Sequence, residues 1–171
     1  RTTLYERFGG WTVKCQITAD YAAPQCELFV AIHRVMTSCG PTGEVWGVTV
    51  KRAPFERSGY ALNLTAGMLP VIGSVVADDG DVIGSAEICT RGEATSGGRR
   101  GSQCQLDPQA ASAFLDVLND PRATVLRITV FERPDPPTTT RRRIEERSLD
   151  LGDFRRAFEA LRIRIEGRVE P

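Results

Sequence analysis

The positions of the five cysteines constrain the fold of this chain more than any other feature. They are Cys15, Cys26, Cys39, Cys89 and Cys104, and ten or more residues separate each from the next. Cysteines of zinc sites stand about two to four residues apart, so these spacings favour disulfides of an oxidising compartment over a metal site. Several pairings are compatible with the sequence alone, and local pairing is favoured because short loops are the easiest to close. We predict Cys15–Cys26 and Cys89–Cys104, with Cys39 as a free thiol.

The residues around the first two cysteines alternate between apolar and polar with the period of a half-buried strand. The apolar phase holds Trp11, Val13, Cys15 and Ile17 in one segment, and Cys26, Leu28, Val30 and Ile32 in the next. Both cysteines therefore face the core of the expected sheet, on a cysteine-linked pair of strands. Two further strands are predicted at 46–50 and 60–64, after turn-forming residues at 38–44.

The second half of the chain combines hairpins with two helices. The tetrapeptide Val-Ile-Gly-Ser occurs at 71–74 and at 82–85, and Asp79-Gly80 between them predicts a hairpin with a two-residue turn. A β-branched strand at 125–131 and a polar partner at 138–148 predict an edge hairpin.

The helix signals lie at 107–119 and 154–161. Asp107 can cap a helix that begins at Pro108 and ends near Asn119, with an apolar face of Ala111, Phe114, Leu115 and Leu118. The spacing of Phe154, Ala157, Phe158 and Leu161 predicts a short second helix that docks on the sheets.

Taken together, these elements predict a mainly-β sandwich with two short helices, stapled by disulfides. The 171 residues fit one domain, with a core at 8–161 and a C-terminal tail at 162–171. The 22 basic and 22 acidic side chains cancel, which argues against a nucleic-acid partner. No segment has the length and apolar character of a membrane span or a signal peptide, so we expect a mature or trimmed chain without a transmembrane segment.

Few residues are candidates for chemistry. His33 falls on the polar face of its strand, and Cys39 lies six residues further along, so a thiol–histidine site is a minor alternative to a surface histidine and a free cysteine. Asp78, Asp79 and Asp81 lack the calcium-loop pattern and are interpreted as part of a turn. We predict no catalytic residues, no metal site and no cofactor.

Two arginine-rich segments are candidate interaction surfaces. The glycine-rich loop 91–101, which a Cys89–Cys104 bond would close, contains Arg91, Arg99 and Arg100. The edge segment 138–147 contains Arg141, Arg142 and Arg143, with acidic residues close by. Solvated charge is the ordinary role of such residues.

Several motifs resemble the invasion-associated locus B family of alphaproteobacteria. They are Phe8-Gly9-Gly10-Trp11-Thr12-Val13-Lys14-Cys15, Gln25-Cys26-Glu27-Leu28, the late cysteine pair, and Ser148-Leu149 leading to Phe154, Ala157-Phe158 and Ala160-Leu161. The resemblance spans 8–161 and implies an immunoglobulin-like sandwich, two local disulfides, an exported protein of the periplasm or outer envelope, and no established catalytic residues. The glycine-rich insert and Cys39 depart from the usual four-cysteine pattern.

The expected function is therefore that of a non-enzymatic, exported envelope protein that acts as a binding module. Its partner would be an envelope or host protein, engaged through sandwich loops or an exposed strand edge, and the chain would be a monomer or a weak homodimer. The alternatives are an uncharacterised periplasmic enzyme and a structural or chaperone-like envelope component. A role in invasion is not transferred from the family name.

Overall fold

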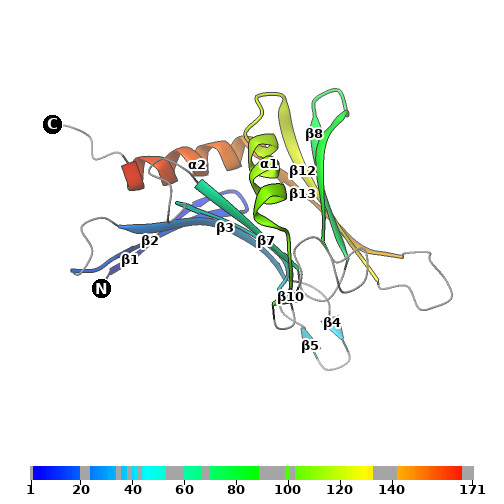
Figure 1. Cartoon of the computed structure of the whole chain (residues 1–171), viewed down its shortest axis with the longest axis horizontal. Coiled ribbons are helices and arrows are strands. Elements are labelled where there is room, and N and C mark those ends of the chain that lie inside the picture. The colour runs from blue at the N-terminus through cyan, green and yellow to red at the C-terminus, as the bar shows by residue number, and fades with distance from the viewer. Residues whose placement is uncertain are drawn as a thin grey trace.

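The computed structural model describes ten segments of the chain. They are residues 2–19, 24–33, 36–37, 40–41, 44–52, 60–66, 70–88, 99–100, 103–132 and 142–166. Strands and two helices make up most of these segments (Figure 1).

The larger sheet is antiparallel and has seven strands. Its order is β1 (Thr2–Phe8), β2 (Trp11–Ile17), β3 (Gln25–His33), β6 (Glu44–Arg52), β7 (Tyr60–Ala66), β11 (Gln103–Gln105) and β10 (Arg99–Arg100). The four predicted strands of the first half are confirmed as β2, β3, β6 and β7. Strand β1 was not predicted, and it pairs with β2 through the Gly9-Gly10 turn.

The smaller sheet has four antiparallel strands. Its order is β13 (Arg143–Asp150), β12 (Ala123–Phe131), β8 (Val71–Ala77) and β9 (Val82–Ile88). The edge hairpin is confirmed, since β13 pairs with β12 and ends the sheet. A separate two-stranded pair consists of β4 (Met36–Thr37) and β5 (Gly40–Pro41), and β5 lies within the stretch 38–44 that was predicted to turn.

Both predicted helices are present. α1 (Pro108–Leu118) begins at the predicted cap, where a carboxylate oxygen of Asp107 accepts hydrogen bonds from the backbone N–H groups of Gln109 and Ala110. It ends at Asn119, and its buried face is the one expected from the sequence.

α2 (Leu151–Glu166) is longer than the predicted short helix and includes the first five residues of the predicted tail. Tertiary contacts extend it: Tyr60 donates a 2.9 Å hydrogen bond to Glu166, and Arg164 lies 3.2 Å from the carboxylate of Glu6.

One core joins the two sheets and the helices, which confirms the β-sandwich. Figure 1 shows α1 and α2 on the same side of the seven-stranded sheet, where α2 contacts β1, β2 and β3 while α1 contacts β7 and β9. Buried side chains of both sheets and both helices form a single cluster, with Trp11, Leu28, Leu126, Phe154 and Leu161 among its fully buried members. Burial of these apolar side chains is the main stabilising contribution.

The β8–β9 turn is longer than predicted. The backbone N–H of Ala77 donates to Asp81 and that of Gly80 donates to Ala77, each at 2.9 Å, so the loop is Asp78-Asp79-Gly80. Gly80 has φ of 89°, which is typical of the last residue of a three-residue hairpin loop. The prediction of a two-residue turn at Asp79-Gly80 was therefore wrong by one residue.

Gly9 allows the β1–β2 turn to pack against the start of α2. It has φ of +59°, and a Cβ placed there would overlap Oδ2 of Asp153. We expect Gly9→Ala to lower the free energy of unfolding by about 1–2 kcal/mol, because a side chain in the left-handed region is strained. Urea unfolding measures this loss.

Gly80→Ala is the matched control for that substitution. Gly80 also has positive φ, at +89°, but nothing lies within 4 Å of its added Cβ. Gly9→Ala should therefore be the more destabilising variant. Equal losses would show that the contact with Asp153 contributes nothing.

An exposed pair forms the link from α1 to β12. The Arg122 guanidinium donates hydrogen bonds to both carboxylate oxygens of Asp120, at 3.1 and 2.9 Å, and the Arg122 backbone N–H adds a third at 2.8 Å. The side-chain bonds, followed by the backbone bond, lower the pKa of Asp120 from 3.8 to about 2.

This pair predicts a local pH dependence. Because the folded-state pKa is depressed, the stabilisation by Asp120 is complete above the unfolded pKa and is lost as pH falls through about 2. Arg122→Gln should raise the pKa of Asp120 most of the way to its ordinary value, because the guanidinium is lost. The return should be incomplete because the backbone hydrogen bond remains. NMR titration of the carboxyl carbon tests this, and an unchanged pKa would contradict it.

Candidate functional site

The predicted Cys15–Cys26 disulfide is confirmed. The two cysteines are directly opposite each other on β2 and β3, with their Cα atoms 4.1 Å apart. Both lie on the inner face, at 2% and 8% exposure, which leaves the opposite face of these strands to polar residues. The close approach of the Cα atoms is typical of a non-hydrogen-bonded pair in an antiparallel ladder.

The remaining predicted site residues are only partly described. Cys39, Cys89, Arg91 and Arg141 lie outside the described residues, so the free thiol and the second disulfide remain predictions. Cys104 lies in β11 opposite Ala66 and Arg99. Arg99 and Arg100 form β10 at one edge of the large sheet, and His33 ends β3 next to a bulge.

Arg142 and Arg143 are exposed at the start of the β13 segment. Arg143 forms an ion pair with Glu146, and Arg127 of β12 lies 3.3 Å from the same glutamate. The ladder shifts register between Val130 and Phe131, which places a bulge in this edge hairpin. Charge and bulges are features that protect an edge strand from pairing with another chain.

Strand β1 forms the edge of the large sheet opposite β10. It has no bulge and fewer charged residues than β13. Its seven residues pair with β2 from Thr2 to Phe8 without a register shift. Six of the seven are exposed, including Leu4 at 40% and Tyr5 at 64%. β1 is thus a regular strand with one unpaired side.

The direction of the β1 backbone groups follows from the ladder. In a two-residue hairpin the flanking residues, here Phe8 and Trp11, form a hydrogen-bonded pair, and such pairs recur at every second residue. The close Cys15–Cys26 pair agrees, because it turns the backbone groups of Cys15 toward Leu4. The backbone N–H and C=O groups of Thr3, Tyr5 and Arg7 therefore point to the open edge.

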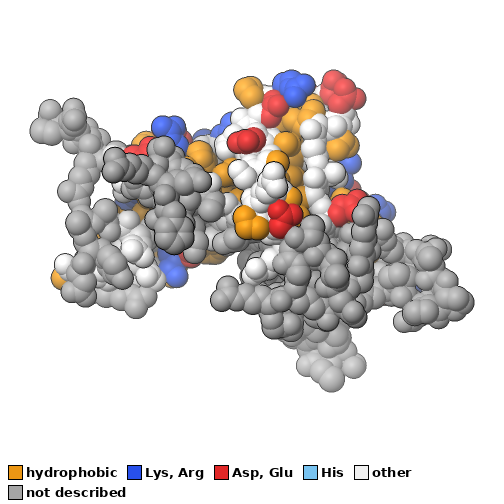
Figure 2. All heavy atoms as spheres, in the orientation of Figure 1, with side chains coloured by type: hydrophobic (Ala, Val, Ile, Leu, Met, Phe, Trp, Pro, Cys, Tyr) orange, Lys and Arg blue, Asp and Glu red, His pale blue; other side chains and the backbone are white. Residues whose placement is uncertain are grey.

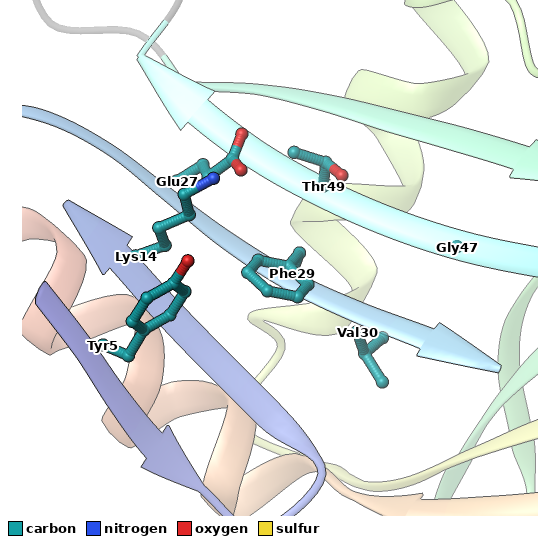
Figure 3. A pocket seen from close by; sticks show the side chains of 7 residues that line it. All are labelled: Tyr5, Lys14, Glu27, Phe29, Val30, Gly47 and Thr49. Atoms are coloured by element: carbon teal, nitrogen blue, oxygen red, sulfur yellow. The ribbon is translucent and has the colours of Figure 1, made fainter. Parts of the chain in front are cut away.

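A shallow groove of about 220 Å³ lies on the outer face of the same sheet, beside β1. It is lined by Tyr5, Lys14, Glu27, Phe29, Val30, Gly47 and Thr49, from strands β1, β2, β3 and β6 (Figure 3). Sequence reasoning missed this groove. The available signal was Phe29, an aromatic residue in the polar phase of its strand.

The charged groups elsewhere do not gather into a second site among the described residues. Asp78, Asp79 and Asp81 belong to the β8–β9 turn, where Asp79 accepts a hydrogen bond from the backbone N–H of Asp81 at 3.0 Å. Within the described segments no three histidine, cysteine or acidic side chains cluster in a way that could hold a metal ion. Figure 2 shows basic and acidic side chains interspersed with hydrophobic ones over α1 and the β8–β9 hairpin.

The fold and these surfaces define a disulfide-linked, two-sheet β protein with an open edge strand and a groove beside it. None of the helices in the described segments is long and apolar enough to span a membrane.

Comparison with known proteins gives one structural similarity. The crystal structure of invasion associated protein b from Bartonella henselae has 17% sequence identity to this chain, covers 92% of it and 94% of its own length, and aligns with a TM-score of 0.47. No family model matches the sequence. The search of curated proteins also found no match.

Proposed function

We propose that this chain is a non-enzymatic, exported envelope protein that binds a protein partner by strand addition at β1. The observation that carries the proposal is the unpaired side of β1, a regular seven-residue strand at the edge of the large sheet. A partner strand would hydrogen-bond to the backbone of Thr3, Tyr5 and Arg7. In this mode backbone bonds supply affinity and alternate side chains supply specificity.

Side-chain exposure supports β1 over the 138–147 surface as the principal edge. Leu4 and Tyr5 offer apolar area on the two faces of the strand, at 40% and 64% exposure. The described part of β13 instead presents the charged residues Arg143, Glu146 and Arg147 next to a bulge. The loop 91–101 remains a second candidate surface from the sequence.

The Cys15–Cys26 disulfide supports export, because disulfides persist in oxidising compartments such as the bacterial periplasm. The sequence motifs of the invasion-associated locus B family support the same location.

Thr3→Pro tests the proposal directly. Proline removes a backbone N–H that faces the open edge and is tolerated on edge strands, whereas Thr3→Val keeps that N–H and is the matched control. The full chain would carry a photo-crosslinking residue in place of Arg7 and be expressed in the envelope of its native cell. Mass spectrometry would then identify the crosslinked proteins.

We expect one dominant partner that is crosslinked in the parent chain and in Thr3→Val, and is lost in Thr3→Pro. A partner that survives in Thr3→Pro would show that binding does not use this edge. Crosslinking only to a second copy of the chain would replace the separate partner with a homodimer and contradict the proposal.

A further inference from the structure

The groove on the outer face of the seven-stranded sheet is lined by two charged side chains, Lys14 and Glu27. Tyr5, Lys14 and Glu27 are opposite one another on β1, β2 and β3, and Figure 3 shows all three side chains at one end of the groove. Lys14 and Glu27 are half-buried. Neither side chain forms a hydrogen bond or ion pair with another described residue. The ammonium of Lys14 and the carboxylate of Glu27 are therefore available to a ligand as donor and acceptor.

Aromatic rings provide the apolar part of the groove. Phe29 is half-buried and lies next to Thr49 in the ladder, while Tyr5 is 64% exposed on the neighbouring edge strand. Figure 3 shows the Phe29 ring between Tyr5 and Thr49. Gly47 also lines the groove and contributes no side chain to it.

The size of the groove limits what it can hold. Enclosed sites for small molecules have volumes of about 300–1,000 Å³. The groove measures about 220 Å³ and is open to solvent, so it suits one ring of a longer ligand whose other parts remain outside.

The charges of Lys14 and Glu27 restrict the chemical groups that the bound ring can carry. An anionic group would meet Glu27 and a cationic group would meet Lys14, since the two side chains occupy opposite positions on adjacent strands. Hydroxyl groups both donate and accept hydrogen bonds, so an uncharged polyol can satisfy the ammonium, the carboxylate and the Thr49 hydroxyl together. The C–H face of a sugar ring supplies the apolar surface that the aromatic rings require.

From these features we infer that the outer face of the seven-stranded sheet binds a neutral oligosaccharide, with one sugar ring placed against Phe29 and Tyr5 and hydrogen-bonded by Lys14 and Glu27. This site shares Tyr5 with the strand-addition edge but relies on side chains of β1, β2, β3 and β6 rather than on the free backbone of β1.

A polyanion is the competing ligand. Arg7 lies in the ladder opposite Thr12, two residues along β1 from Tyr5, which places a basic residue beside the groove. Single-stranded nucleic acids bind to such surfaces by stacking bases on aromatic rings beside basic residues. The test must therefore separate a sugar from an anion.

Titration of the isotope-labelled full chain by NMR provides that test, with maltotriose and triacetylchitotriose as the sugar probes. A six-residue oligothymidylate and phosphocholine serve as charged probes. We expect at least one sugar to shift the amide signals of strands β2, β3 and β6 around the groove. Phe29→Ala should weaken the binding about tenfold, as expected for the loss of one aromatic contact with its buried area.

The charged residues have a matched control on the other sheet. Lys14→Gln and Glu27→Gln should each weaken sugar binding, whereas Arg127→Gln and Glu146→Gln change a cross-strand pair of β12 and β13 and should leave it unchanged. Thr3→Pro should also leave it unchanged, so failure of the strand-addition proposal would not affect this result. The amide spectrum of each variant reports whether it is folded.

Three results would overturn the inference. The first is that neither sugar shifts any amide signal at about 10 mM. The second is that the shifts are confined to residues outside the groove. The third is that only oligothymidylate or phosphocholine binds.

Discussion

Phe154→Ala is expected to lower the free energy of unfolding by about 3–5 kcal/mol, because it removes a large aromatic ring from the core. Phe154 is fully buried in α2, with its ring centroid 4.9 Å from that of Trp11 and 5.9 Å from that of Phe158. Its removal would leave a cavity where α2 meets β2. Urea unfolding of the parent and variant chains gives the difference.

Two variants show whether the loss arises at that contact. Phe158→Ala removes a ring of the same size that is only half-buried, so it should cost clearly less. A double-mutant cycle of Phe154→Ala with Trp11→Ala should show a coupling of about 0.5–1.5 kcal/mol from the edge-to-face pair. If Phe154→Ala does not fold, Phe154→Leu provides a milder comparison. A loss below about 1 kcal/mol would contradict the packing described for α2.

The same contact explains why motifs from the two ends of the chain occur together. Gly9 packs against Asp153, a Cβ added at Gly10 would lie 2.9 Å from Leu149, and Trp11 packs against Phe154. The opening and closing motifs that resemble the invasion-associated locus B family are therefore one structural unit, where the β1–β2 turn meets the start of α2. Packing accounts for the residue types at Gly9, Gly10, Trp11 and Phe154.

Elements with strong local signals could be predicted from the sequence. In β2 and β3 one face is buried and the other is polar, so the alternation is clear and both strands were found. α1 was located to within a residue because its cap chemistry, Asp107 followed by Pro108, lies in the sequence itself. The same reasoning placed Cys15 and Cys26 on the inner faces of neighbouring strands.

Elements that depend on tertiary contacts could not be predicted. β1 is exposed on both faces, so its apolar residues Leu4 and Tyr5 fall in opposite phases and give no alternation. The last turns of α2 depend on contacts of Glu166 and Arg164 with β7 and β1. The outer-face groove requires the register of four strands, which no single segment reveals.

Removal of the Cys15–Cys26 disulfide by the double substitution Cys15→Ala and Cys26→Ala is expected to cost about 3 kcal/mol. The bond spans a sequence separation of 11 residues, and without it the unfolded chain regains the freedom of that loop. Two half-buried strands also lose a buried sulfur pair on the inner face of the sheet. Urea unfolding of the double variant under oxidising conditions isolates this bond from any other disulfide.

The reduced parent chain is the necessary comparison. If the predicted Cys89–Cys104 bond also forms, reduction should destabilise the parent chain by more than the double substitution does, and reduction should further destabilise the double variant. Equal stability of the reduced and oxidised double variant would show that no disulfide other than Cys15–Cys26 stabilises the fold. A double variant as stable as the oxidised parent would mean that the β2–β3 ladder alone already holds this loop.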